Sequence, residues 1–211
     1  MDLETPIDRA SAIAWARSVL MRDETVFLDT ETTGLGRGAE IVDIAVVTAS
    51  GEVLVDLMVR PFGRIPFEAT QIHGISDEDV AGAPCWSDAL DLLRPILFDR
   101  EIVVYNVGFD RTMLRQCCDR IGALVPRAGW HCAMKAFAAY RQERVRGRPG
   151  FRWHSLPAAA AWFGLPAGGH RALADAEVCR RVVAMRRSRR PSCARRHAGR
   201  GSCTPRRAST G

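Results

Sequence analysis

The first residues that could do chemistry are two carboxylates, Asp29 and Glu31, which follow the β-rich run of residues 25–28. Residues two apart on a strand point to the same face, so these side chains should lie together. Carboxylates that are forced together repel each other unless a cation lies between them, and their hard oxygen atoms suit Mg²⁺ or Mn²⁺. The pair is compatible with a metal site, although such a pair alone is more often two solvated charges.

A third carboxylate, Asp110, ends the segment Tyr105-Asn106-Val107-Gly108-Phe109-Asp110, which carries a strand through a tight turn into a helix. Asp110 falls in the first helical turn, where the helix dipole favours a negative charge. Capping of the helix would by itself explain an aspartate at this position. The segment therefore gains meaning only from the other acidic residues.

The fourth carboxylate, Asp175, follows His170 within the segment Gly168 to Asp175. Five residues on a helix turn through about 500°, so His170 and Asp175 could not share one helical face. If His170 instead lies on the Gly-Gly loop before the helix, its imidazole can approach Asp175. A histidine near metal-bound water can act as a general base, because imidazole titrates near neutrality. The alternative is an exposed loop histidine and a capping aspartate.

The elements that must position these residues follow from the hydrophobic periodicity. Apolar residues at helical spacing predict a helix over residues 8–22, with Asp8 as its N-cap. Strand-like segments at 41–49 and 53–59 are separated by Ser50-Gly51, which is typical of a β-hairpin. Further strands are predicted at 25–28, 102–105 and 130–132, and further helices at 86–98, 109–121, 133–142, 155–163 and 172–187. Short helices and loops are expected over 61–84, and a mobile loop over 144–152.

This order of elements predicts the fold class. Three strands, followed by alternating strands and helices, are typical of an α/β layered fold with a mixed sheet. The hairpin makes the first three strands antiparallel. Helices should then flank the sheet.

The three motifs together resemble those of the DEDDh-type 3′–5′ exonucleases, a DnaQ-like superfamily. It includes the proofreading epsilon subunit of bacterial polymerase III and oligoribonuclease. The order and spacing match over residues 25–187, and the run from Leu28 to Gly34 carries the first motif. Residues 71–75, Gln-Ile-His-Gly-Ile, also resemble a segment that lies near the terminal nucleotide in many members. The resemblance implies a ribonuclease H-like fold and hydrolysis at the 3′ end of a strand.

The resemblance also implies roles for the five residues. Asp29, Glu31, Asp110 and Asp175 would hold two divalent cations, Mg²⁺ or Mn²⁺, about 3.5–4 Å apart, which stabilise the entering and leaving oxygens. Asp29 would bridge both ions, Glu31 and Asp175 would hold the ion that carries the attacking water, and Asp110 would support the other. His170 would take the proton. No small-molecule cofactor is expected.

The residues expected to contact the 3′-terminal nucleotides are Thr30, Thr33, Gly34, Leu35, Ile72, His73, Asn106 and Phe109. Leu35, Ile72 and Phe109 could stack on or wedge against bases, because apolar contact tolerates any base. A place in the core is an equal alternative for these three. Tyr105 stands where several members have His, and we expect it to act in packing or in a substrate contact. His131 is better interpreted as a structural residue than as a metal ligand.

Charge and composition divide the chain into two parts. Residues 1–185 carry 21 basic and 24 acidic side chains, a net charge of −3, and the remainder adds +9 to give the total of +6. We therefore expect an exonuclease domain over residues 1–187 and a disordered, Arg-rich tail over residues 188–211. From residue 186 onward there is no Leu, Ile, Val, Phe, Trp or Tyr with which the chain could form a core. The tail could bind phosphates, dock on an acidic partner or be inert.

The sequence also leads to expectations about the cellular location and the substrate. The acidic N-terminus does not resemble a secretory signal, no window is apolar enough to span a membrane, and no Cys-x-x-Cys pair occurs, so we expect a cytoplasmic protein that contacts no membrane. The expected substrate is the 3′ end of single-stranded DNA or RNA, with nucleoside 5′-monophosphates as products. DNA is favoured because the first motif and residues 71–75 resemble the proofreading branch more than oligoribonuclease. A polymerase-associated module with little catalysis, or an RNA exonuclease, stays open.

Overall fold

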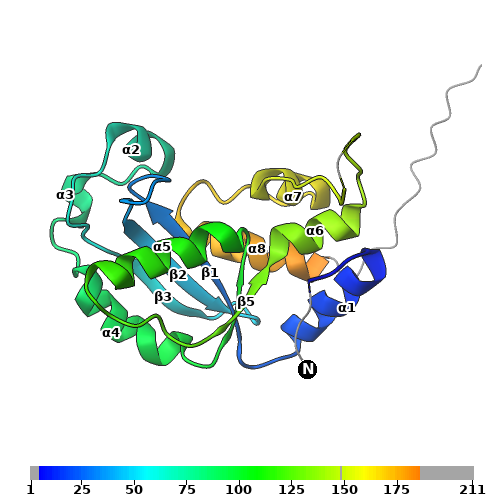
Figure 1. The fold of residues 1–211 in the computed structure, drawn as a ribbon, viewed down its shortest axis with the longest axis horizontal. Helices are drawn as coiled ribbons and strands as arrows, with labels where there is room; N and C mark the ends of the chain where they lie inside the picture. Colours follow the sequence, from blue (N-terminus) through cyan, green and yellow to red (C-terminus); the bar gives the residue numbers. More distant parts are fainter. Residues whose placement is uncertain (1–4, 148, 186–211) are drawn as a thin grey trace, which may run out of the picture.

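A computed structural model describes residues 5–147 and 149–185 of the chain. Its centre is a five-stranded sheet with the strand order β3-β2-β1-β4-β5 (Figure 1). The strands are β1 (Thr25–Thr32), β2 (Ile41–Thr48), β3 (Val53–Met58), β4 (Glu101–Val104) and β5 (Gly129–Cys132). β1, β2 and β3 pair antiparallel, whereas β1, β4 and β5 pair parallel. The predicted α/β fold with a mixed sheet and an antiparallel first half is confirmed.

The side chains of β1 alternate between the two faces of the sheet, as the geometry of a strand requires. Phe27 packs into a core with α1 (Arg9–Leu20), α6 (Ala133–Arg141), α7 (Leu156–Phe163) and α8 (Ala172–Met185). Its neighbours Val26 and Leu28 pack into a second core with α4 (Trp86–Leu97) and α5 (Val107–Arg120). In Figure 1, α5 crosses in front of the sheet. One end of β1 is thus enclosed by α8 on one face and by α5 on the other.

The local signals in the sequence placed most of these elements to within two residues. Asp8 caps α1, because its side chain accepts a hydrogen bond from the Ser11 backbone N–H at 2.7 Å, while the Ser11 hydroxyl accepts one from the backbone N–H of Asp8. The segment between β3 and α4 holds two short helices, α2 (Phe67–His73) and α3 (Asp77–Val80), as expected. The segment expected to be a mobile loop contains one isolated bridge, between Arg144 and Phe151.

Some expectations fall partly or wholly outside the described residues. The predicted tail, residues 188–211, lies there, as do the last two residues of the helix predicted over 172–187. Within the described ranges, no helix combines the length and the apolar character needed to cross a membrane. The cysteines in the same ranges form no disulfide with one another.

Candidate active site

Asp29 and Glu31 lie in the second half of β1 on the face that carries Phe27, and Thr30 between them points to the opposite face. The pairing with β2 puts Glu31 directly opposite Asp43. The sheet therefore holds three carboxylates on the face that α8 covers. The prediction that Asp29 and Glu31 share a face is confirmed.

Asp110 approaches the same end of β1 from α5, on the opposite face of the sheet, and its charge acts on Asp29. It lies in the first turn of that helix, after the N-cap residue Asn106, and its side chain is buried. Its Oδ1 accepts a hydrogen bond from the hydroxyl of Thr30 at 2.9 Å. This bond joins the helix to β1 and fixes the orientation of the carboxylate. Asp110 is therefore more than a helix cap, although it occupies the capping turn.

His170 and Asp175 come from the segment before α8 and from its first turn. His170 has a φ of +57° and precedes the start of α8 at Ala172, so it lies on the loop and not on the helix. Ligand atoms of Glu31, His170 and Asp175 all lie within 4.8 Å of one another. A side chain at Gly168 would collide with the Asp175 carboxylate, so the close approach of this loop requires glycine. The loop position that would let His170 approach Asp175 is thus observed.

The electrostatics show that these acidic groups share one site. Burial raises the pKa of Asp29 well above its ordinary value, and the charges of Asp110, Asp175 and Glu31 raise it further. Burial, followed by the charge of Asp175, raises the pKa of Glu31 to about 7. Burial also raises the pKa of Asp110, whereas the hydrogen bond from Thr30 opposes that rise. Asp29 and Glu31 are therefore costly to ionise beside the other carboxylates.

The pKa of Asp175 is also raised by burial, and the nearby His170 acts in the opposite direction. A set of buried carboxylate oxygens that repel one another fits a hard divalent cation, whose charge would remove the repulsion. Glu31, His170 and Asp175 have the spacing of a metal-holding group. The donor set therefore suits hard divalent cations.

Two residues that we did not predict, Asp43 and Arg171, join β2 to the segment that carries His170. Asp43 is 1% exposed, and its Oδ2 accepts hydrogen bonds from Arg171 Nε at 2.9 Å and from the Ala172 backbone N–H at 3.2 Å. These bonds tie β2 to the start of α8, immediately after His170. The sequence signal was a carboxylate inside the otherwise apolar run Ile41-Val42-Asp43-Ile44. A charge in a buried strand needs a partner, and this partner is 128 residues away.

A pocket of about 370 Å³ opens beside Glu31. Seven of the eight residues expected to contact the terminal nucleotides line it: Thr30, Thr33, Gly34, Leu35, Ile72, His73 and Phe109. Leu35 and Ile72 are 84% and 59% exposed, so the alternative that they belong to the core is wrong. Phe109 lines the pocket and also packs against the core beside α5. The eighth residue, Asn106, is exposed and is not among the lining residues.

His73, Tyr105 and His131 each form a contact within the fold. His73 is buried, its Nδ1 accepts a hydrogen bond from the Ile75 backbone N–H at 3.1 Å, and burial lowers its pKa. Tyr105 donates its hydroxyl to the carbonyl oxygens of His154 and Ser155, at 2.7 and 3.0 Å. His131 pairs with Glu101 across β4 and β5. The last two contacts agree with the packing role and the structural role expected for Tyr105 and His131.

Comparison with known proteins agrees with this geometry. The sequence profile of the family described as "Exonuclease" matches residues 26–183. The chain is 38% identical over 173 residues to an uncharacterized exonuclease, CP81, of Escherichia phage 186, a match that covers 77% of this chain and 88% of the phage protein. It is 34% identical over 91 residues to the DNA polymerase III subunit epsilon of Rickettsia conorii, a match that covers 40% of each protein.

Solved structures show the same fold. The nuclease domain of 3′hExo, described as a DEDDh family member bound to rAMP, superposes with a TM-score of 0.61 at 16% identity, over 77% of this chain and 90% of that chain. Cell-death related nuclease 4 superposes with a TM-score of 0.54 at 14% identity, over 76% of this chain and 64% of that chain. The mixed sheet with flanking helices is thus ribonuclease H-like. The chain therefore belongs to the exonuclease family.

Proposed function

We propose that this protein removes nucleotides one at a time from the 3′ end of a single-stranded nucleic acid and releases nucleoside 5′-monophosphates. The observation that carries the proposal is the convergence of Asp29, Glu31, Asp110 and Asp175 beside His170. These side chains come from β1, α5 and α8, far apart in the chain. Nothing in the packing of a core requires four carboxylates to meet.

The four carboxylates would hold two divalent cations, Mg²⁺ or Mn²⁺. When bound, such ions supply positive charge that stabilises a phosphorane-like transition state and lowers the pKa of water. Asp29 is the most central of the ligands, because its pKa responds to the charges of the other three. The hydrogen bond from Thr30 orients Asp110. The mutual repulsion of the side chains gives the site its affinity for cations.

His170 is the proposed general base. Its loop position brings a ring nitrogen within 4.8 Å of ligand atoms of Glu31 and Asp175. From there the imidazole can accept the proton of the attacking water. The nearby carboxylate of Asp175 would stabilise the imidazolium that forms. The left-handed φ at His170 holds the ring outside α8, where substrate can reach it.

End specificity follows from the pocket beside Glu31. Its volume of about 370 Å³ and its exposed Leu35 and Ile72 suit one terminal nucleotide held by apolar contact. The 3′ polarity is supported by the names of fold relatives, which include 3′-exonucleases. A strand whose last base fills the pocket would present its terminal phosphodiester to the carboxylates.

DNA is the favoured substrate. The match to a DNA polymerase III subunit epsilon at 34% identity supports DNA, whereas the relative bound to rAMP shares only the fold at 16% identity. The same polymerase match supports a second proposal, association with a DNA polymerase. The match covers 40% of that subunit, so this second proposal rests on that part of the subunit alone.

The test uses 5′-labelled single strands of DNA and RNA, the purified full chain, and Mg²⁺ or Mn²⁺ with an EDTA control. We expect a ladder of products that shortens from the 3′ end. Asp29→Ala should abolish it and His170→Ala should reduce it by about 10²–10⁴-fold, the usual contribution of a general base. Asp91→Ala, which removes an exposed carboxylate of α4, is the matched control and should retain full activity. Internal cleavage products would contradict the proposal.

A further inference from the structure

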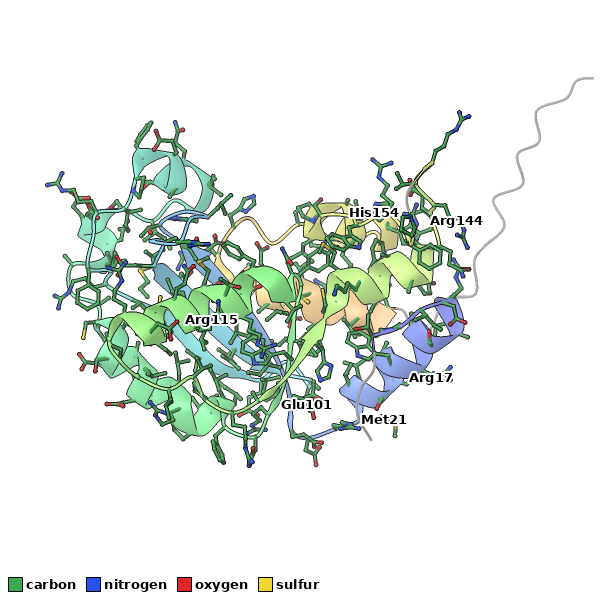
Figure 2. The ribbon with its side chains drawn as sticks, in the orientation of Figure 1. Arg17, Met21, Glu101, Arg115, Arg144 and His154 are labelled. Atoms are coloured by element: carbon green, nitrogen blue, oxygen red, sulfur yellow. The ribbon has the colours of Figure 1, made fainter. Side chains whose placement is uncertain are left out.

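A second concave surface lies on the other side of α5 from the carboxylates. It is a groove of about 720 Å³ between the outer face of α5 and residues 125–130, which end in the first two residues of β5. Its lining includes Arg111, Arg115, Arg127 and Trp130, and no acidic residue lines it. Figure 2 shows Arg115 on α5, on the face of the molecule that is turned to the viewer. We call this surface the arginine groove.

The positive charge of the arginine groove is not neutralised locally. Arg111 and Arg115 are exposed, and neither forms an ion pair with any carboxylate in the described residues. They are four residues apart on one helix face, where two like charges repel and destabilise the helix. Arg127 is the exception, because it pairs with Asp99 at 2.7 Å. Two uncompensated guanidinium groups in one groove suit an anionic ligand.

Trp130 adds an aromatic surface to the groove. Its side chain is half-buried and packs partly against the core of α4 and α5. Guanidinium groups beside an aromatic ring are the combination with which proteins hold single-stranded nucleic acid, because phosphates meet the charges and bases stack on the ring. An acidic protein partner would need the charges and would gain little from the ring. The surface therefore favours an unpaired strand.

The position of the groove relates it to the candidate active site. The first turn of α5 borders both, because Phe109 lines the pocket for the terminal nucleotide while Val107 and Gly108 line the arginine groove. Asp110 points inward to Thr30, and Arg111, the next residue, is rotated by about 100° toward the groove. A strand that leaves the pocket across the start of α5 would meet the groove within a few nucleotides.

We propose that the arginine groove binds the phosphate backbone of the substrate strand on the 5′ side of the nucleotide that is removed. The assignment of the 5′ side rests on the proposed function, whereas the binding of a single strand by the groove does not. Arg111 and Arg115 contact phosphates, and Trp130 contacts a base. The groove thus makes affinity depend on strand length.

The experiment measures binding apart from hydrolysis. Fluorescence anisotropy in EDTA, with the full chain, gives the affinity for labelled single-stranded DNA and RNA of about 15 nucleotides, a length that spans such a groove. At about 0.1 M salt, Arg111→Ala/Arg115→Ala should lower this affinity about tenfold or more. The slope of log affinity against log salt should become less steep by about 1.4, the value for two phosphate contacts to a single strand.

Two further variants separate charge from fold and from position. Arg17→Ala/Arg144→Ala removes the same charge from α1 and from the loop before α7, both remote from α5 (Figure 2), and should leave the affinity within about twofold of wild type. Arg111→Lys/Arg115→Lys keeps the charge and should retain most of the affinity, because lysine also binds phosphate. With Mg²⁺ present, Arg17→Ala/Arg144→Ala should hydrolyse a labelled strand of about 15 nucleotides at the wild-type rate.

The proposal is overturned if the Arg111→Ala/Arg115→Ala variant binds both long strands as wild type does, the result that an acidic partner would produce. It is also overturned if the lysine variant loses as much affinity as the alanine variant. A wild-type protein that binds the long strands through the groove but hydrolyses nothing would refute the proposed function and leave the groove intact. A preference between the DNA and RNA strands identifies which backbone the groove accepts.

Discussion

The Asp43 carboxylate and the Arg171 guanidinium form an ion pair, with 2.9 Å between Oδ2 and Nε, that joins β2 to the residue immediately after His170. The same oxygen accepts the Ala172 backbone N–H, so it also caps the start of α8. Asp43 lies directly opposite Glu31 on β2, but it does not line the pocket and is not part of the group of ligand atoms from Glu31, His170 and Asp175. It is therefore a positioning residue, which fixes where the loop ends and the helix begins.

Replacement of Asp43 by asparagine should lower kcat more than it raises KM. Asparagine keeps one oxygen but cannot hold the Arg171 charge, and the loop that carries His170 would shift. A misplacement of about 1 Å can cost as much as 10²-fold in rate, so we expect a loss of about tenfold to a hundredfold. Steady-state kinetics on a 5′-labelled oligonucleotide measure it. Asp91→Asn is the control, and wild-type kinetics for Asp43→Asn would refute the positioning role.

The metal-free protein should lose stability as the pH rises. The pKa of Glu31 is raised from 4.5 to about 7 in the folded state, so the folded protein holds a proton that the unfolded chain has released. The free energy of unfolding should therefore fall between about pH 4.5 and 7. Divalent ions bind the ionised carboxylates, so Mg²⁺ or Mn²⁺ should raise Tm more at about pH 8 than at about pH 5. Thermal melts with and without EDTA measure both effects.

Asp29→Asn tests the same repulsion from the opposite direction. It removes the buried charge at the centre of the cluster, so the metal-free variant should melt above wild type at about pH 8, by about 2–4 °C for each kcal/mol relieved. The same variant should be inactive. Asp91→Asn should follow the wild-type melting curve. If Asp29→Asn melts below wild type in EDTA at this pH, the carboxylates do not repel one another in the way described.

Gly168→Ala should impair the site without a change in any polar group. The added Cβ would collide with the Asp175 carboxylate, so either the loop or the first turn of α8 must move. We expect a loss of activity of about tenfold or more, because His170 and Asp175 would move apart. Gly82→Ala is the matched control, since a Cβ at Gly82 meets no atom within 4 Å. Equal activity of the two variants would contradict the close approach that the structure describes.

The sequence predicted those parts of the molecule that depend on local pattern. The β-rich run that leads into Asp29 and Glu31 and the helix turn that carries Asp110 were predicted from local pattern, although β1 continues to Thr32, beyond the predicted residues 25–28. The sequence did not decide whether His170 belongs to the helix or to the loop before it. The loop position was therefore stated only as the condition under which His170 can approach Asp175. The left-handed φ values at Gly169 and His170 decide it.

The parts that sequence reasoning missed depend on contacts between distant segments. Asp43 interrupts an apolar strand, but its partner Arg171 is known only when α8 is placed over β2. The arginine groove likewise forms between α5 and residues 125–130, so it could not be predicted from the sequence of either segment alone. The exposure of Leu35 and Ile72 was undecided for the same reason. An apolar side chain usually indicates burial, and only the packing of distant segments shows that these two are exposed and line a pocket.

The central claim is that carboxylates from β1, α5 and α8 together bind divalent cations, and calorimetric titration with Mn²⁺ tests it most directly. At about pH 7.5, above the raised pKa of Glu31, the wild-type protein and Asp91→Ala should show the same saturable binding. Asp29→Ala and Asp110→Ala should each lose it or weaken it by about tenfold or more, the scale seen when support of a metal site is removed. Wild-type Mn²⁺ binding by both Asp29→Ala and Asp110→Ala would contradict the account.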